Sequence, residues 1–386
     1  MKNVKFILMN VFLLLLFISC KQSGRKAESA GTAPSYSNPL NVAIGDPYVL
    51  KDSASKYYMY GSDRGGKNKD KAYPVYSSSD LVNWVYEGLS LKRDTNTSWC
   101  VGAFWAPSAY KYNNKYYMFY SAQWRNNPQN ELENFRIGVA VSDKPTGPFV
   151  DIQNSPIFDP GYPIIDADVL FDSDGRVYLY YSRCCYKHPV ESEIAQWARS
   201  KGWFTEIEES WVYGVEIDKS FTKTIGEPVL LLRPPLQMND SISFWENRSV
   251  MSHEVNRRWT EGSYALKHND TYYMTYSANN VAGTNYSIGY AMAKSPLGPY
   301  VKASNNPIVQ KNIDKGGVVS GTGHSSITFS PDGKEMFCIY HGRTTQTGHS
   351  RVLFIDRMEI LSSGQMVVHG TSAEPQPYPS GVSEIK

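Results

Sequence analysis

Lys56-Tyr57-Tyr58-Met59-Tyr60 is a short apolar run rich in tyrosine, and four similar runs follow it along the chain. Aromatic and β-branched residues in such runs favour strands over helices. The later copies begin at residues 115, 176, 271 and 335 and read Lys-Tyr-Tyr-Met-Phe-Tyr, Arg-Val-Tyr-Leu-Tyr-Tyr, Thr-Tyr-Tyr-Met-Thr-Tyr and Glu-Met-Phe-Cys-Ile-Tyr. They lie about 60 residues apart, with one gap of about 95, and a unit of this size holding about four strands is typical of a large propeller blade. We therefore predict an all-β chain folded as a five-bladed β-propeller.

A second repeated element supports this architecture. Residues 139–149 and 290–300 each read as a strand followed by a turn built on Pro and Gly. The wide third gap indicates an insertion at about residues 184–250, in which Val190 to Lys201 has the apolar spacing of one short helix. We expect this insertion to pass over one face of the propeller. A pair of β-sandwiches is the alternative fold, but it does not explain why one position recurs in every unit.

Each run is preceded, at a fixed distance, by a residue that carries a charge or a large polar or aromatic group. Counting back eleven residues from the second residue of each run gives Asp46, Trp105, Asp166, Glu261 and Ser325, the last beside His324. The innermost strand of each blade runs along the axis of a propeller, so one equivalent position in every blade is one place in space. We expect these side chains to converge on a shared funnel.

Three of the converging residues are carboxylates, which points to acid–base chemistry. Like charges a few ångströms apart raise at least one pKa, so the three cannot all be ionised at low cost. Hydrolysis of a glycosidic bond requires this inequality, because one carboxyl group must protonate the leaving oxygen while another acts ionised on the opposite side. A single Asp before Pro, such as Asp46, is often only a turn former. Its register with Asp166 and Glu261 favours the catalytic interpretation.

Five ordered motifs resemble those of the family 43 glycoside hydrolases. They are Gly45-Asp46-Pro47-Tyr48-Val49, Phe104-Trp105-Ala106-Pro107, Ile165-Asp166-Ala167 with Phe171-Asp172-Ser173-Asp174-Gly175, Glu261-Gly262-Ser263 and Gly321-Thr322-Gly323-His324. The resemblance covers roughly residues 40–360 and implies a five-bladed propeller with an inverting mechanism. It implies that Asp46 is the general base, that Glu261 is the general acid and that Asp166 raises the pKa of Glu261 and orients it. Ser263 departs from the usual Pro of this motif.

Position at the funnel, for Trp105, and the resemblance, for Arg343 and His324, indicate residues that contact the sugar or an ion. Trp105, with Phe104 before it, is expected to bind substrate, and Arg343 in Tyr340-His341-Gly342-Arg343 resembles an arginine of the −1 subsite. His324 is expected near the axis, where it would contact a structural calcium through water, since imidazole is a poor ligand for a hard cation. No cofactor is required for the reaction. The alternatives are a core tryptophan, a surface arginine and a structural histidine.

Other acidic and aromatic residues compete for these roles. Asp168 is a rival of Asp166, and Glu254 and Glu246 are rivals of Glu261, but the eleven-residue step selects none of them. Trp99 and Trp124 are weaker candidates for a sugar platform than Trp105. The remaining cysteines, Cys100, Cys184, Cys185 and Cys338, have no metal-binding spacing, and we interpret them as small buried or unpaired side chains, although a disulfide from Cys100 to Cys184 or Cys185 stays open.

The N-terminus predicts export. Lys2 and Lys5 precede an apolar run that ends at Ser19-Cys20, an order typical of a secretory signal. The run is too short to span a bilayer, and its end resembles a bacterial lipobox, although Phe17 replaces the usual Leu. We expect a lipoprotein signal at 1–20, a flexible tether at 21–38 and the catalytic propeller at 39–386. Cys20 would then anchor the protein in a bacterial cell envelope, facing the periplasm or the cell surface. A cleaved signal with an incidental cysteine is the alternative.

Composition excludes one class of partner and leaves carbohydrate as the expected one. The formal net charge is +2, with scattered Lys and Arg, so nothing indicates a nucleic-acid interface. The predicted function is release of a pentose, α-L-arabinofuranose first, from plant-type glycans, with the insertion favouring exo action. β-Xylosidase and galactan- or galactofuranose-cleaving activities stay open. The motifs of a retaining fructan hydrolase are absent from this sequence. A non-catalytic glycan-binding lipoprotein would not need all three carboxylates.

Overall fold

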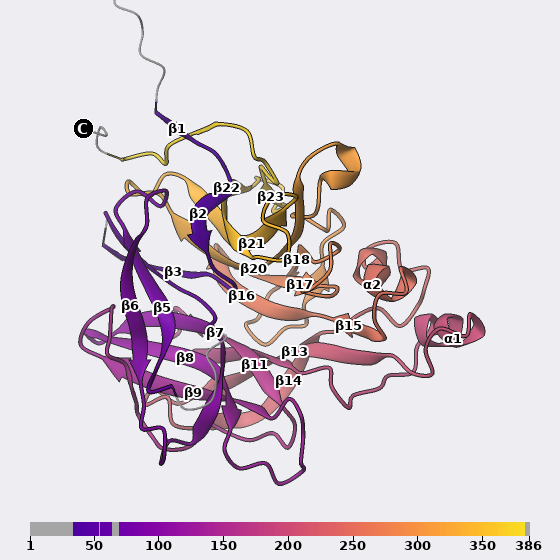
Figure 1. Ribbon diagram of the computed structural model, residues 1–386, viewed down its shortest axis with the longest axis horizontal. Helices are drawn as coiled ribbons and strands as arrows, with labels where there is room; N and C mark the ends of the chain where they lie inside the picture. Colours follow the sequence, from indigo (N-terminus) through magenta and orange to yellow (C-terminus); the bar gives the residue numbers. More distant parts are fainter. Residues whose placement is uncertain (1–33, 54, 64–68, 383–386) are drawn as a thin grey trace, which may run out of the picture. The chain divides into compact units, whose positions relative to one another are not determined.

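The computed structural model describes residues 34–53, 55–63 and 69–382, and within them five antiparallel sheets follow one another along the chain (Figure 1). Blades 1 and 2 consist of β3 (Tyr48–Ser53), β4 (Lys56–Tyr60), β5 (Lys71–Ser78) and β6 (Val85–Lys92), then β7 (Cys100–Tyr112), β8 (Lys115–Trp124), β9 (Phe135–Ser142) and β10 (Val150–Asp151). Blades 3 and 4 consist of β11 (Ile164–Phe171), β12 (Val177–Arg183), β13 (Glu208–Ile217) and β14 (Thr224–Leu232), then β16 (Glu261–His268), β17 (Thr271–Ala278), β18 (Ser287–Ala293) and β19 (Val301–Lys302). Blade 5 consists of β20 (Val319–Phe329), β21 (Met336–Thr344), β22 (Val352–Ile360) and β2 (Leu40–Ala43).

The innermost strands close into a ring. β3 contacts β7, β7 contacts β11, β11 contacts β16, β16 contacts β20, and β20 returns to β3. The ring is locked by the N-terminal strand β2, which pairs with β22 of the last blade, so the indigo start of the described chain lies beside its yellow end (Figure 1). The prediction of an all-β, five-bladed propeller is confirmed.

The described fold begins before the boundary expected from sequence. β1 (Ser35–Tyr36) pairs with β24 (Gln376–Pro377), and the buried Asn38 side chain donates to the Ile355 carbonyl at 2.9 Å. Residues 34–38 therefore belong with the propeller rather than with a tether. The expected signal segment, Cys20 and most of the expected tether lie outside the described residues. Within the described ranges, no helix has the length and apolarity needed to cross a membrane.

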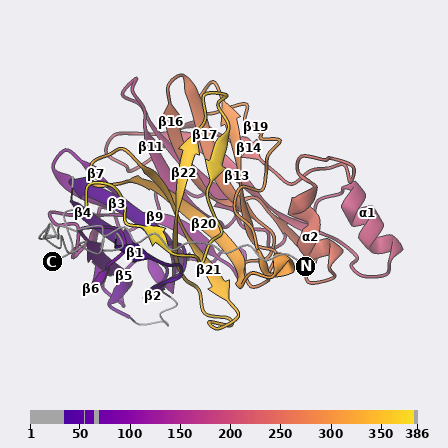
Figure 2. The same ribbon diagram turned by 90° about the horizontal axis from the view of Figure 1, so that it is seen from above.

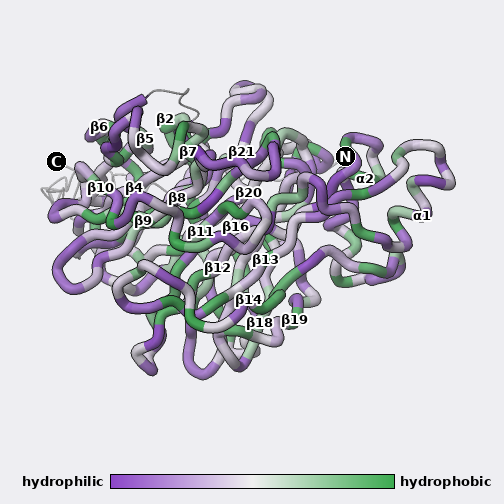
Figure 3. The backbone as a smooth tube through the Cα atoms, turned by 90° about the horizontal axis from the view of Figure 1, so that it is seen from below, coloured by the Kyte–Doolittle hydropathy of each residue, from purple (hydrophilic) through white to green (hydrophobic). Residues whose placement is uncertain are grey.

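The core is divided among the blades. Hydrophobic stretches of the chain fall mainly on the strands, and many connecting loops are hydrophilic (Figure 3). Buried aromatic side chains pack between neighbouring sheets; Tyr110 of blade 2, for example, contacts Phe171 of blade 3 with ring centroids 5.6 Å apart. The four cysteines of the described chain are free and buried, as in the simpler interpretation of the sequence.

A lysine and a tyrosine of one blade donate hydrogen bonds to an aspartate in the inner hairpin of the previous blade. Asp52 of blade 1 accepts hydrogen bonds from Lys111 Nζ at 2.7 Å and from Tyr116 Oη at 2.8 Å, both from blade 2. The same arrangement joins blades 3 and 4 through Asp172, Lys267 and Tyr272. These tyrosines are the anchors of the sequence repeat, so the repeat records contacts between blades as well as strand periodicity.

The insertion is split into two segments rather than forming one excursion. β13 and β14 are regular strands of blade 3, so the extra residues are 184–207 and about 233–256. The first segment contains α1 (Glu193–Ser200), as predicted, with Ser192 as its N-cap. The second contains the 3₁₀ turn η1 (Phe244–Asn247) and α2 (Arg248–Met251), and it leads into β15 (Arg257–Trp259), which pairs with β13. The two helices lie on the same side of the propeller (Figure 2) and pack through a small apolar cluster.

The five predicted site residues do not share one position, which corrects the sequence analysis. A register shift recurs in the innermost strands, between Trp105 and Ser108, Ile165 and Asp168, Glu261 and Tyr264, and Gly323 and Ser326. The residues with left-handed backbone at this irregularity are Asp46, Ala106, Asp166, Gly262 and His324. Trp105 and Glu261 stand one residue earlier, and Ser325 one residue later.

Differences in hairpin length explain why the step of eleven residues does not reach the same position in every blade. Asn113 and Asn114 alone connect β7 to β8, whereas residues 172–176 connect β11 to β12 and residues 330–335 connect β20 to β21. A fixed step of eleven residues therefore reaches different points of the irregularity in different blades. Non-glycine residues with left-handed backbone cost about 1–3 kcal/mol each and cluster at functional sites.

Candidate active site

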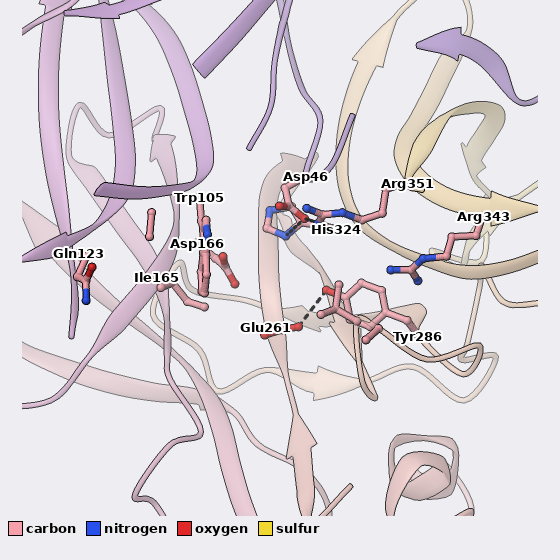
Figure 4. Close-up of a pocket in the computed structure, with 13 residues that line it drawn as sticks. Asp46, Trp105, Gln123, Ile165, Asp166, Glu261, Tyr286, His324, Arg343 and Arg351 are labelled. Atoms are coloured by element: carbon pink, nitrogen blue, oxygen red, sulfur yellow. Dashed lines mark hydrogen bonds and ion pairs between the residues drawn. The ribbon is translucent and has the colours of Figure 1, made fainter. Parts of the chain in front are cut away.

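One cavity of about 540 Å³ opens at the ends of the innermost strands, and all five blades contribute to it. The three predicted carboxylates face it together with cationic and aromatic side chains (Figure 4). Its lining residues are Asp46, Ala103, Trp105, Gln123, Ile165, Asp166, Glu261, Val281, Ala282, Tyr286, His324, Arg343 and Arg351. Convergence of the trio, inferred from the repeat, is thus observed.

Asp46 is held ionised by a surrounding set of positive and hydrogen-bonding groups. Arg351 Nη1 donates to Asp46 Oδ1 at 2.8 Å, His324 Nδ1 lies 3.5 Å from the same oxygen, and the Ser62 hydroxyl donates to Oδ2. Burial by itself raises the pKa of Asp46, but Arg351, His324 and Ser62 together hold this pKa well below its usual value. Gly45 makes the ion pair possible, because a Cβ there would lie 2.1 Å from Arg351 Cζ.

Glu261 has the opposite environment. It is the first residue of β16 and is 8% exposed, and its side chain accepts a hydrogen bond from Tyr286 Oη to Oε1 at 3.0 Å. Burial raises the pKa of Glu261 well above its usual value, and the negative charge of Asp166 raises it further. Glu261 therefore retains a proton at pH values where Asp46 is ionised.

The environment of Asp166 combines burial, as at Glu261, with groups that stabilise the ionised form, as at Asp46. Its Oδ2 accepts from Ser182 Oγ at 3.1 Å and from the Gly262 N–H at 3.1 Å, so it is tied to the residue that follows Glu261. Burial raises the pKa of Asp166, whereas His324 and these two donors favour its ionised form. Because Asp166 has two donors and Glu261 has a single hydroxyl donor, we assign the retained proton of this pair to Glu261.

Tyr286 and His341 complete the surroundings of the trio and were not predicted from sequence. The Tyr286 ring stacks on His341 at 5.7 Å, and His341 Nδ1 accepts the backbone N–H of Asp46 at 3.1 Å. Burial lowers the pKa of His341 well below its usual value, so the ring is neutral and its Nδ1 is free to accept. These contacts hold Asp46 and Glu261 from opposite ends of one stack.

The predicted sugar-contact residues divide into two groups. Trp105 lines the cavity with its ring stacked on Phe135, the centroids being 4.1 Å apart, and Arg343 lines it from β21. Phe104 does not. Its side chain is fully buried between blades 1 and 2, 5.6 Å from the Tyr73 ring, because adjacent residues of a strand point to opposite faces. The assignment of Phe104 to substrate binding is therefore corrected.

The rival residues have structural partners. Asp168 accepts from Tyr110 Oη and from the Ala265 N–H, both at 2.7 Å, and so joins three blades. Glu246 is buried beside Lys302 and Tyr276. Neither lines the large cavity, nor do the exposed Glu254 and the tryptophans Trp99 and Trp124.

The calcium expected near His324, with contact through water, stays a prediction. Behind His324 there is a second cavity of about 10 Å³, lined in part by Asp166, Asp168 and Ser325. Over the residues that the structure describes, no group of three or more His, Cys, Asp or Glu is arranged to hold a metal.

The cavity wall also corrects the argument made from the insertion. None of the lining residues comes from 184–250; the wall on the blade 4 side is built instead by Val281 and Ala282, in the loop between β17 and β18. Because the insertion does not line the cavity, it gives no direct reason to prefer exo action. Arg351 and Gln123 are further lining residues that the sequence analysis missed.

The arrangement is suited to acid–base hydrolysis. The protonated carboxyl group of Glu261 in blade 4 and the ionised one of Asp46 in blade 1 face a common cavity. The charge of a third carboxylate, Asp166, raises the pKa of Glu261 further above that of Asp46. A proton donor and a proton acceptor on two sides of one bound molecule are what cleavage of a glycosidic bond by water requires.

Comparisons with known proteins agree with this chemistry. Residues 36–366 match the family described as Glycosyl hydrolases family 43. Beta-D-galactofuranosidase xynD of Aspergillus niger is 25% identical over 374 residues, which cover 92% of this chain and 91% of that protein. Xylosidase/arabinosidase 43A of Humicola insolens is 31% identical over 277 residues, covering 67% and 76%. The crystal structure of a thermostable family-43 glycoside hydrolase is similar with a TM-score of 0.74 and 38% identity, covering 89% of this chain and 99% of that one.

Proposed function

Since this chain belongs to glycoside hydrolase family 43 and is thus a hydrolase of O-glycosyl bonds, we propose that it is an inverting α-L-arabinofuranosidase. The observation that carries the proposal is the pairing of an ionised Asp46 with a protonated Glu261 in one cavity. Similarity to a xylosidase/arabinosidase supports a pentose as the sugar. A glycan containing arabinose or xylose is the proposed natural substrate.

The proposed mechanism is a single displacement by water. Asp46 takes a proton from the water as it attacks the anomeric carbon, and Glu261 gives its proton to the leaving oxygen as the glycosidic bond breaks. Asp166 keeps the pKa of Glu261 high and orients Glu261 through the Gly262 N–H. Trp105 offers an apolar face to the sugar ring, and Arg343 offers donors to its hydroxyl groups.

The test is a panel of chromogenic glycosides. We expect the described domain to release nitrophenol from α-L-arabinofuranoside faster than from β-D-xyloside or β-D-galactofuranoside, and to release arabinose from arabinoxylan or arabinan. NMR of the first product should show the anomer opposite to that of the substrate. Retention of configuration would overturn inversion, and sugar binding without turnover of any glycoside or polymer would favour the non-catalytic alternative.

Galactofuranose is the second candidate sugar. The galactofuranosidase of A. niger aligns with nearly the full length of this chain, which is the observation that favours it. β-D-Xylose is the third, given the mixed name of the H. insolens relative. A higher kcat/KM for either glycoside than for the arabinofuranoside would replace the sugar in the proposal and leave the mechanism unchanged.

Replacing Arg351 with methionine should move the acidic limb of the pH profile. Arg351 is the strongest of the groups that lower the pKa of Asp46, so its removal raises that pKa. Asp46 must be ionised to act, and activity is lost as pH falls through its pKa. The acidic limb of kcat/KM should therefore shift upward by about 1–3 pH units. An unchanged limb in the folded variant would show that Asp46 does not control it.

Replacing Asp166 with asparagine should move the basic limb instead. After burial, Asp166 is the largest cause of the raised pKa of Glu261, so loss of its charge lowers that pKa. Glu261 must be protonated to act, and activity is lost as pH rises through its pKa. The basic limb of kcat/KM should shift downward while the acidic limb stays within about half a pH unit. A shift in the opposite direction would reverse the proton assignment.

The proposed location is the bacterial cell envelope, with a lipid on Cys20 and no cofactor. Support comes from the order of charged, apolar and small residues before Cys20 in the sequence. Metabolic labelling with radioactive palmitate should label the full chain, and Cys20→Ser should abolish the label. Labelling that survives this substitution would remove the anchor from the proposal.

A further inference from the structure

The loop between β17 and β18 forms one wall of the cavity. It spans residues 279–286 and places Val281, Ala282 and Tyr286 among the lining residues. Tyr286 is fixed by its own contacts, since it is 1% exposed, stacks on His341 and accepts from Thr322 Oγ1 through its carbonyl. Val281 and Ala282 are less enclosed, being half-buried and exposed respectively. The contacts at the start of the loop help to fix their position.

The start of the loop is bound to the second segment of the insertion by Asn279. This residue is fully buried and has left-handed backbone with φ of 76°, a conformation that Asn tolerates better than most residues. Its Oδ1 accepts the Ser249 N–H at 3.0 Å, and its Nδ2 donates to the Trp245 carbonyl at 2.9 Å. One side chain therefore satisfies two backbone groups of η1 and α2.

Asn280 extends the same connection. Its N–H donates to Ser249 Oγ at 2.9 Å, and its Nδ2 donates to Glu254 Oε1 at 2.9 Å. Its own Oδ1 accepts the Ala282 N–H at 3.0 Å, so the amide links the insertion directly to the wall. Glu254 also lies against Gly283, where a Cβ would approach Glu254 Oε1 to 1.9 Å.

We propose that residues 244–254 are a positioning element that fixes the Val281–Ala282 wall and thereby sets the affinity of the cavity for its sugar. This inference rests on the proposed function. It gives the second segment of the insertion a role although it contributes no lining residue. A wall held before binding does not have to be ordered by the substrate, so the fixed loop favours binding. Residues 244–254 should therefore influence KM, whereas kcat depends on Tyr286 and the carboxylates, which are held independently.

The contact between Glu254 and the loop can be broken from either side without touching the core. Glu254→Ala removes the acceptor of the Asn280 amide from an exposed side chain. Gly283→Ala keeps the Glu254 residue but displaces its carboxylate, since the added Cβ clashes with the far end of this flexible side chain. Glu254→Gln is the matched control, because its amide oxygen still accepts from Asn280.

The experiment compares these three variants with the wild type on the chromogenic arabinofuranoside, and measures L-arabinose binding by calorimetry. Glu254→Ala and Gly283→Ala should each raise KM and the Kd for arabinose by about five- to tenfold, with kcat changed less than about twofold. Glu254→Gln should keep the wild-type KM. Val281→Phe, which narrows the cavity at the wall itself, should raise KM without lowering the melting temperature.

Specific results would overturn the positioning role. These are an unchanged KM in both Ala variants, equal losses in Glu254→Gln and Glu254→Ala, or a fall in melting temperature with no change in KM. A wild-type protein that neither cleaves nor binds any of the glycosides would instead overturn the proposed function, and the positioning role with it. An active wild type whose variants match it overturns the positioning role alone.

Discussion

Replacing Glu261 with glutamine lowers kcat for an arabinoxylan oligosaccharide by about 10²–10⁴-fold, the range typical of general acid–base catalysis. Glutamine keeps the size of the side chain and an oxygen that can accept from Tyr286 Oη, but it has no proton to give to the leaving oxygen. The side chain is buried and lies at the start of β16, so the variant should fold. Steady-state kinetics with thermal melting separates lost chemistry from lost protein.

The leaving group provides the decisive control for this prediction. A sugar alkoxide needs protonation as it leaves, whereas dinitrophenolate is stable without a proton. The loss in Glu261→Gln should therefore shrink to about tenfold on the dinitrophenyl glycoside. Glu227→Gln, the same change at an exposed carboxylate on β14, should match the wild type on both substrates. An equally large loss on both substrates would mean that Glu261 does not act as the acid.

The sequence was sufficient to predict the architecture and the convergence of the three carboxylates on one cavity, for physical reasons. The Tyr57, Tyr116 and Tyr272 anchors recur because each binds the previous blade, so the repeat records the geometry of the ring. The carboxylates Asp46, Asp166 and Glu261 stand near one irregularity of the innermost strand, and closure of the ring brings them together.

Other parts of the site were not accessible to this reasoning. Arg351 reaches Asp46 across 305 positions of sequence, and the pairing of β2 with β22 helps to bring the first and last segments together. The one-residue offset of Glu261 depends on hairpin lengths that the strand pattern does not reveal. Phe104 was misassigned because neighbouring Trp105 shares its motif, although the pleat of β7 turns the two side chains to opposite faces.

Replacing Asp46 with asparagine should lower kcat by about 10²–10⁴-fold on every substrate, whatever its leaving group. Asparagine can still accept from Arg351 Nη1, but a neutral amide cannot take a proton from the attacking water. This independence of the leaving group distinguishes the base from the acid, since both glycosides need the same water. Asp143→Asn, at a side chain that is 82% exposed, is the matched control and should match the wild type.

An external nucleophile tests the role of Asp46 further. Azide attacks without losing a proton, so it should restore turnover of the dinitrophenyl glycoside in Asp46→Asn by about tenfold or more, and the glycosyl azide should have inverted configuration. Azide should not accelerate the wild type, in which water is already activated. Because the substitution leaves Arg351 with a neutral partner in a partly buried site, melting curves must show that the variant is folded. If a folded Asp46→Asn retained more than about a tenth of the wild-type rate, the base would have to be sought among the other groups of the cavity.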